Sequence, residues 1–395
     1  MKKFVIFLAI CVVGLFNIGP SIELLAESKT DDNIIQELNN CIDVQIGNFD
    51  FNELDLYLSK LSSQYSFLSA NTFKDVVKQI TLGDYFSDFN SVFDVIFSFL
   101  FSEIKNVLPV IFLIVAVSVI SGLLNLIKAS SSGDGVGSVI YFVCYAVIVL
   151  LISTIIKNVV DVTSSTLQTM SGQMEIIFPI LLTLLTSIGS VASVGIYKPL
   201  VSVLIQGVSF LFSNFLFPIF IISFVLLVVG NLSTTIKLNK ASEFLSSVFK
   251  WVVGFVFTMF GAFLTIQGIS VARYDGISIK ATKFAVKSYI PLIGGYLSDG
   301  LDLILCSSVI IKNAIGLVGL VLILLTIISP IIKIVVLKFG LQLVSAILEP
   351  IGNSGVSNFT SGCSKVLVYP IVLILSVAFM YLLSVGLIMS TANIF

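Results

Sequence analysis

The chain has 395 residues, of which 57% are hydrophobic and only 11% are charged, and its formal net charge is −1. Soluble domains carry about 25% charged residues, and a hydrophobic surplus of this size cannot be hidden in one soluble core. The composition therefore predicts a protein dissolved in lipid, and the near-zero charge argues against a nucleic-acid partner. The chain also lacks histidine, the commonest metal ligand and general base, so we expect no enzyme activity, catalytic residue, metal site or cofactor.

Residues 1–26 have the pattern of a secretory signal peptide. Two lysines precede an apolar run over residues 4–16, and Ala26 is a small residue suited to cleavage. An uncleaved signal anchor is the alternative, because Leu24 is larger than cleavage sites prefer. Both alternatives place the following segment outside the cytoplasm.

Residues 27–104 are predicted to form an acidic, extracytoplasmic helical region. Residues 21–103 contain 14 acidic residues and four lysines, a net charge of −10, whereas residues 104–395 contain eight acidic and 15 basic residues, a net charge of +7. One helix is expected where Phe51, Leu54, Leu58 and Leu61 share a face, and a second over residues 73–80. Such a region is either a small helical domain or a docking module for partners, and the two interpretations are compatible. Its end, residues 89–104, is an amphipathic segment suited to the membrane interface.

Residues 105–395 are predicted to form a polytopic membrane domain with six to eight transmembrane helices, so the fold class is an all-α polytopic integral membrane protein with a small exported helical N-terminal region. The 31-residue run 200–230 is long for one crossing, and Asn214 and Pro218 are expected to kink it. Polar segments are expected to separate the spans: 157–175 outside the membrane, an interruption at 197–199, and a Gly/Ser loop at 352–364. The predicted spans are 107–127, 139–156, 176–196, 200–230, 251–271, 314–332, 366–389 and, as a span or an interfacial helix, 333–350.

The stretch SYIPLIGGYLSDGLDLILCSSVIIKNAIG, residues 288–316, places charged residues in an apolar context. One interpretation is a broken or re-entrant segment that lines a conduit, because ionised groups at membrane depth usually mark a pathway. The other is an amphipathic helix at the cytoplasmic interface whose acids face water. The candidate pathway residues are Pro291, Gly294, Gly295, Asp299, Asp302, Lys312 and Asn313.

Residues 275–316 resemble the most recognisable part of the stage III sporulation protein AE family. The overall layout also resembles this family, with a signal peptide, an acidic exported region and a polytopic body. Outside residues 275–316 the resemblance is one of architecture, together with the pair Glu349-Pro350 and the last span. The matching positions are Asp275-Gly276, Lys283-Phe284, Pro291, Gly294-Gly295, Ser298-Asp299, Asp302, Lys312-Asn313 and Gly316.

The resemblance implies an integral membrane subunit of the sporulation transenvelope channel, a secretion-like complex that links mother cell and forespore. It further implies location in the mother-cell membrane around the forespore, a need for the protein in forespore development and late gene expression, and partners that include ring-forming membrane proteins and a cytoplasmic ATPase. The alternative is a stand-alone secondary transporter or permease for a small solute. A coupled transporter usually carries ionisable groups deep in several spans, and the predicted spans contain almost none.

Overall fold

The computed structural model describes residues 32–62, 72–82, 89–130, 134–232, 238, 240–262, 264–265, 294–350 and 354–391. These residues are helical almost throughout and contain no strand, so the predicted all-α fold is confirmed. The predicted signal peptide and Pro291 lie outside the described residues.

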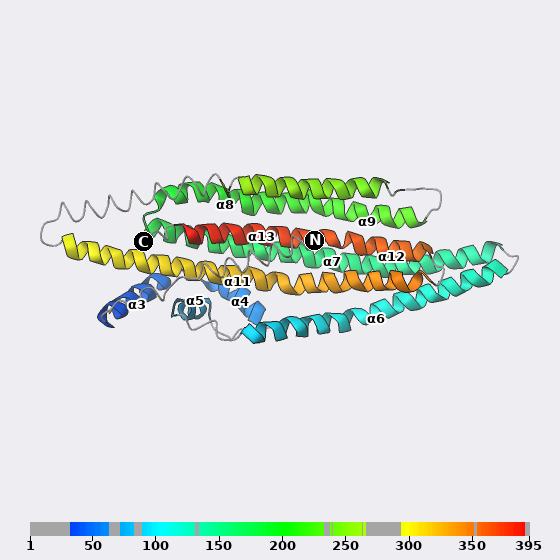
Figure 1. Cartoon of the computed structure of the whole chain (residues 1–395), viewed down its shortest axis with the longest axis horizontal. Helices are drawn as coiled ribbons and strands as arrows, with labels where there is room; N and C mark the ends of the chain where they lie inside the picture. Colours follow the sequence, from blue (N-terminus) through cyan, green and yellow to red (C-terminus); the bar gives the residue numbers. More distant parts are fainter. Residues whose placement is uncertain are drawn as a thin grey trace.

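Three helices form the long axis of the molecule: α6 (Phe89–Ser130), α7 (Asp134–Ser187) and α11 (Gly294–Leu348). α11 packs against α6, α7, α12 (Ser354–Val366) and α13 (Val368–Ser390), as Figure 1 shows. At 54 and 55 residues, α7 and α11 are each about 80 Å long, whereas the hydrocarbon core of a bilayer is about 30 Å thick. Both helices are therefore long enough to project well beyond a membrane that they cross.

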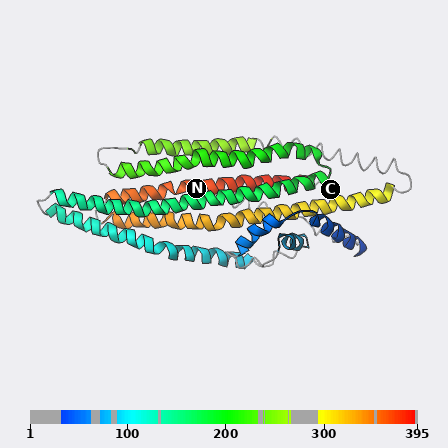
Figure 2. The ribbon, with the colours of Figure 1, turned by 180° about the vertical axis from the view of Figure 1, so that it is seen from behind.

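The last helix lies at the centre of the bundle, and other helices lie at its edge. In Gly355–Ser390, 72% of the most apolar 18-residue segment is buried, whereas the corresponding share is 17% in Phe97–Ile120 and in Lys240–Ala262. A further layer comprises α8 (Val191–Leu211) and α9 (Phe217–Leu232), and Lys240–Ala262 runs beside them in Figures 1 and 2. Helices with so little buried surface need lipid or other proteins around them.

Five helices of the described chain are long and apolar enough to cross a membrane, which supports a multi-pass membrane protein. They lie in Phe97–Ile120, Phe142–Ser187, Lys240–Ala262, Asp302–Leu348 and Gly355–Ser390. Two of these stretches are 46 and 47 residues long, because neighbouring predicted spans belong to one helix. The prediction of six to eight crossings stays a prediction.

The expected break at residues 157–175 is wrong, because α7 continues through it. The Ser/Thr-rich segment contains neither glycine nor proline before Gly172, and its hydroxyl groups bond within the helix. Thr163 donates to the Val159 carbonyl at 2.6 Å, and Thr166 donates to the Val162 carbonyl at 2.7 Å. Local back-bonding of this kind satisfies the polar groups without leaving the helix.

The chain turns between α7 and α8 at residues 188–190 rather than at 197–199. Gly189 adopts φ 87°, a left-handed conformation that glycine accepts without strain. Its N–H donates to the Thr186 carbonyl at 2.9 Å, and Ser190 N–H donates to the Leu185 carbonyl at 3.0 Å. This pair of bonds is a Schellman motif, which ends the helix. Pro199, which was expected to interrupt a span, lies inside α8.

Asn214 and Pro218 lie at an irregular turn, as expected. Residues Phe212–Leu216 form a π-helical turn between α8 and α9, with Phe217 N–H bonded to the Phe212 carbonyl. Pro218 has no N–H with which to bond the Asn214 carbonyl, so regular α-helical bonding fails there.

Two further expectations about the C-terminal half are wrong. α11 continues through Pro330 to Leu348, so 314–332 and 333–350 are one helix. The expected Gly/Ser loop at 352–364 is mostly the helix α12. α12 packs against α11 through small side chains: Ser345 donates to the Ser357 carbonyl at 2.9 Å, and Ser357 donates to the Ser345 carbonyl at 3.0 Å. Small residues let membrane helices approach closely. The glycines and serines that indicated a loop therefore form a packed interface between two helices.

The N-terminal head, residues 32–82, contains α3 (Asp32–Gly47), α4 (Asn52–Ser62) and α5 (Phe73–Leu82). The predicted α4 face is confirmed, because Leu54, Leu58 and Leu61 are buried, and α5 confirms the second predicted helix. Asp55 Oδ1 accepts a bond from Phe73 N–H at 2.5 Å, and a 2.9 Å ion pair joins Lys78 to Asp43. Hydrogen bonds from Thr72 lower the pKa of Asp75, which caps the start of α5. The head packs on α11 and α7, on one side of the bundle (Figure 2).

Candidate functional site

The structure places the candidate pathway residues along one helix. α11 begins at Gly294 and continues without a break through Asn313. Asp302 is half-buried and Lys312 is buried, but ten residues of helix separate their Cα atoms by about 15 Å. The described part of this stretch is therefore continuous helix from the glycine pair onward, and its role in lining a conduit stays a prediction. The acidic residues belong to the first part of α11, and their position at the cytoplasmic interface also stays a prediction.

A fully buried lysine on α11 is hydrogen-bonded to the C-terminal end of α13, the last helix. The Lys312 ammonium donates hydrogen bonds to the backbone carbonyls of Met389, at 3.0 Å, and Thr391. These carbonyls lie at the C-terminal end of α13, where a helix lacks intrahelical donors and carries partial negative charge. The hydroxyl groups of Thr391 and Tyr197 lie 3.0 Å apart, which adds α8 to the junction. Three helices therefore converge near Lys312.

Replacing Lys312 with methionine should loosen the end of α13. Two carbonyls lose a charge-assisted donor, so the amides of residues 387–391 should exchange with solvent about tenfold faster. Hydrogen exchange of the full chain in detergent, followed by mass spectrometry, measures this change. Lys198→Met is the control, because Lys198 is exposed on α8 beside Tyr197. Unchanged exchange in the Lys312 variant would contradict the assigned role.

Gln45 of the head forms side-chain hydrogen bonds with two serines of α11. Gln45 Nε2 donates to Ser307 Oγ at 2.9 Å, and Ser308 Oγ donates to Gln45 Oε1 at 3.0 Å. Both serines are buried. On the adjoining side, the Tyr57 hydroxyl lies where a side chain at Gly172 would stand. Burial, and then the nearby carboxylates of Glu53 and Glu175, raise the pKa of Tyr57.

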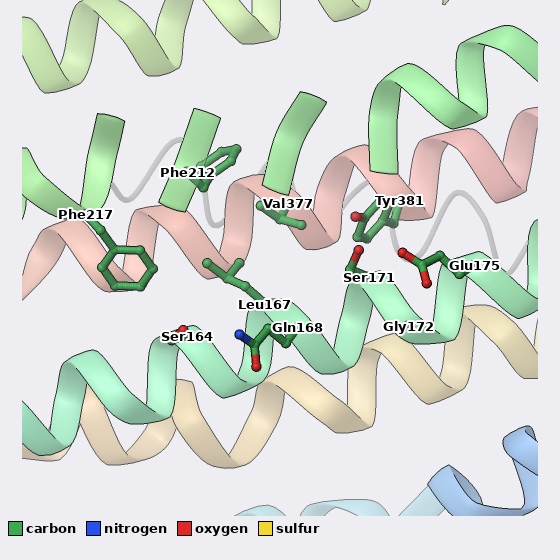
Figure 3. A pocket seen from close by; sticks show the side chains of 10 residues that line it. All are labelled: Ser164, Leu167, Gln168, Ser171, Gly172, Glu175, Phe212, Phe217, Val377 and Tyr381. Carbon is green, nitrogen blue, oxygen red and sulfur yellow. The ribbon is translucent and has the colours of Figure 1, made fainter. Parts of the chain in front are cut away.

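The polar segment of α7 lines two cavities on opposite faces of the helix. The first cavity, of about 240 Å³, lies between α7, α13 and the π-helical turn (Figure 3). Glu175 and Ser171 lie on the side of Tyr381, to which Ser171 is hydrogen-bonded. The lining residues are Ser164, Leu167, Gln168, Ser171, Gly172, Glu175, Phe212, Phe217, Val377 and Tyr381.

The second cavity, of about 270 Å³, lies between the head, α6, α7 and α11. Lys60, Glu103 and Lys333 contribute charges of both signs. Gln173 is fully buried there, and its Nε2 donates to Thr326 Oγ1 at 3.0 Å. The segment that was expected to meet water outside the membrane thus supplies polar walls inside the bundle.

Sequence reasoning missed the residues of the first cavity, although a signal was present. Ser164, Gln168, Ser171 and Glu175 recur at intervals of four, three and four residues, which places them on one helical face. The interpretation of 157–175 as a break concealed this spacing. The aromatic wall has no comparable signal, because only the packing of α8, α9 and α13 brings Phe212, Phe217 and Tyr381 together.

Comparison with known proteins identifies the family. A profile described as Stage III sporulation protein AE (spore_III_AE) matches residues 71–392, most of the chain. The chain belongs to the stage III sporulation protein AE family. It is 26% identical over 272 residues to the Stage III sporulation protein AE of Bacillus subtilis (strain 168), which covers 69% of this chain and 68% of that protein. No solved structure matches the chain.

The family match begins at residue 71, so it includes α5 and the whole helix bundle but not α3 and α4. Lys312, its carbonyl partners and both helices that carry the first cavity lie within it. The Stage III sporulation protein AE family supports a role in sporulation, and the resemblance inferred from residues 275–316 is confirmed.

Proposed function

We propose that this chain is an integral membrane subunit of a transenvelope channel complex that links the mother cell and the forespore, and that it catalyses no reaction. In this proposal it lies in the mother-cell membrane around the forespore, with its head outside the cytoplasm. Its partners are ring-forming membrane proteins and the cytoplasmic ATPase of the stage III sporulation complex. The complex in turn supports forespore development and late gene expression. The family match supports the sporulation role from which this proposal starts.

The length of the bundle is the main support for the proposal that this chain works as part of a larger complex. α7 and α11 each extend about 50 Å farther than a hydrocarbon core is thick. Apolar side chains remain exposed on α6, α7 and α11: Phe112 is 67% exposed, Leu150 67% and Phe339 61%. Lipid cannot cover the whole length of such a bundle, whereas partner subunits can cover the remainder.

Photo-crosslinking in sporulating cells tests this proposal. A photoreactive residue at position 112, 150 or 339 should form adducts with other membrane proteins made during sporulation. The same residue at position 359, which is buried inside the bundle, should form none. Adducts with lipid alone at all three exposed positions would contradict the proposal. Solute uptake by liposomes that contain only the purified chain would favour the stand-alone transporter.

A further inference from the structure

The first cavity has the composition of a site for a positively charged organic group. Glu175 is the one charged residue among the described residues that line it, which also include Phe212, Phe217 and Tyr381. No lysine or arginine of the described chain lies within ion-pair distance of Glu175. Glu175 lies beside Tyr381, and Phe212 and Phe217 lie farther along the cavity, toward Ser164 (Figure 3). Because the face of an aromatic ring carries partial negative charge, the carboxylate and the Tyr381 ring together attract cations.

The oxygen atoms of the cavity are spread too widely for a bare metal ion. Ser164 and Glu175 are eleven residues apart on α7, about 16 Å along the helix. Oxygen ligands of a hard cation such as calcium must lie about 2.3–2.6 Å from it. One ion cannot use both ends of this stripe, whereas an elongated molecule can place its charge at Glu175 and a polar group toward Gln168 and Ser164.

The local backbone adds two features at the same place. Pro179 follows Glu175 by one turn and has no N–H, so the Glu175 carbonyl lacks its ordinary helical donor. Phe212 begins the π-helical turn and Phe217 follows it, and both rings line the cavity. π-helical turns occur frequently at functional sites, because they reposition side chains that a regular helix would direct elsewhere.

The cavity is open at Gln168 and Glu175, which are exposed, and its volume suits a small molecule. About 240 Å³ corresponds to the liquid volume of about eight water molecules. A short aliphatic amine with a second polar group fits this space. Its ammonium would contact the Glu175 carboxylate and the Tyr381 ring, and its methylene groups would contact Leu167 and Val377, which are the aliphatic side chains in the lining.

We infer that the first cavity is a binding site for a small primary amine that carries a second polar group. The amine is either a free solute or the ethanolamine headgroup of a phospholipid, because both present the same ammonium. The inference does not depend on the proposed channel complex, since the isolated chain contains every residue of the site.

Isothermal titration calorimetry of the purified full chain tests the inference. The probes are ethanolamine and 5-aminopentanol, with pentane-1,5-diol as the uncharged comparison, at constant ionic strength. Saturable binding of an amine in detergent, without binding of the diol, is the expected result. If neither amine binds to the wild-type chain in detergent or in phosphatidylglycerol nanodiscs, the inference is overturned, whatever the variants do.

Three variants locate the binding. Glu175→Gln keeps the size of the side chain but removes the charge, so amine affinity should fall about tenfold. Phe217→Leu removes a ring from the apolar end of the cavity and should reduce the affinity for the longer amine about threefold, through lost apolar contact. Asp161→Asn is the matched control, because Asp161 is an exposed acid on the same helix that lines neither cavity. Equal losses in the Glu175 and Asp161 variants would overturn the assignment, because they would indicate non-specific charge attraction.

Nanodiscs distinguish the two sources of the amine. If phosphatidylethanolamine discs abolish the binding of soluble amine and phosphatidylglycerol discs restore it, the occupant is the lipid headgroup. If both lipids permit equal binding, the occupant is a free amine. Both results support the site, and the failure of the complex proposed above would affect neither.

Discussion

Replacement of Ser165 by proline should lower the free energy of unfolding by about 3 kcal/mol or more. Ser165 is an exposed residue in the middle of α7, so the change creates no steric conflict in a packed core. Proline removes the N–H that bonds to the Asp161 carbonyl, and its ring collides with that carbonyl. Reversible unfolding of the purified chain in detergent micelles, followed by circular dichroism, measures the loss.

Ser165→Ala is the control, because it removes the same hydroxyl group without affecting the backbone, and its effect should be within about 0.5 kcal/mol. A proline variant as stable as the alanine variant would mean that 157–175 is not helical. The chain would then cross the membrane twice in this region, as the sequence alone predicted.

Replacement of Phe359 by alanine should cost about 3–5 kcal/mol of folding stability, because the side chain is fully buried and a cavity remains. Phe359 lies in α12, and its ring centroid is 5.6 Å from that of Tyr145 on α7. The contact also joins two helices that are far apart in the sequence. The same unfolding assay in detergent measures the change.

Phe339→Ala is the matched control, since Phe339 is 61% exposed on α11 and its truncation should change stability by less than about 0.5 kcal/mol. Equal effects of the two substitutions would show that Phe359 is not in a packed core. The segment 352–364 would then behave as the Gly/Ser loop that its composition indicates.

Local sequence patterns correctly predicted the elements whose structure depends on residues close together in the sequence. The leucine face of α4 and the helix α5 follow from apolar residues at helical spacing, and both occur as expected. Asn214 and Pro218 indicated an irregular turn for a reason that is also local, the missing N–H of proline. The apolar character of the body followed from composition.

The breaks between helices could not be predicted in this way. Ser, Thr and Gly normally indicate a loop where water surrounds the backbone, but α7 and α12 bury such residues against other helices. Pro330 normally ends a helix, but α11 continues through it because neighbouring helices pack around it on several sides. Conversely, Gly189 ends α7 inside an apolar run, and the only local signal was this glycine in the sequence Ser187-Ile188-Gly189-Ser190.

The candidate site shows the same division. The sequence singled out Lys312, since a lysine in an apolar helix needs a partner, but its partners are backbone carbonyls about 77 residues away that no side-chain pattern reveals. Composition and periodicity by themselves determined a lipid-dissolved helical protein and an amphipathic head, whereas the polar stripe on α7 was present in the sequence but was missed. Only the tertiary structure decided where helices continue, what Lys312 contacts and which rings line the cavity with Glu175, because these depend on contacts between segments distant in the chain.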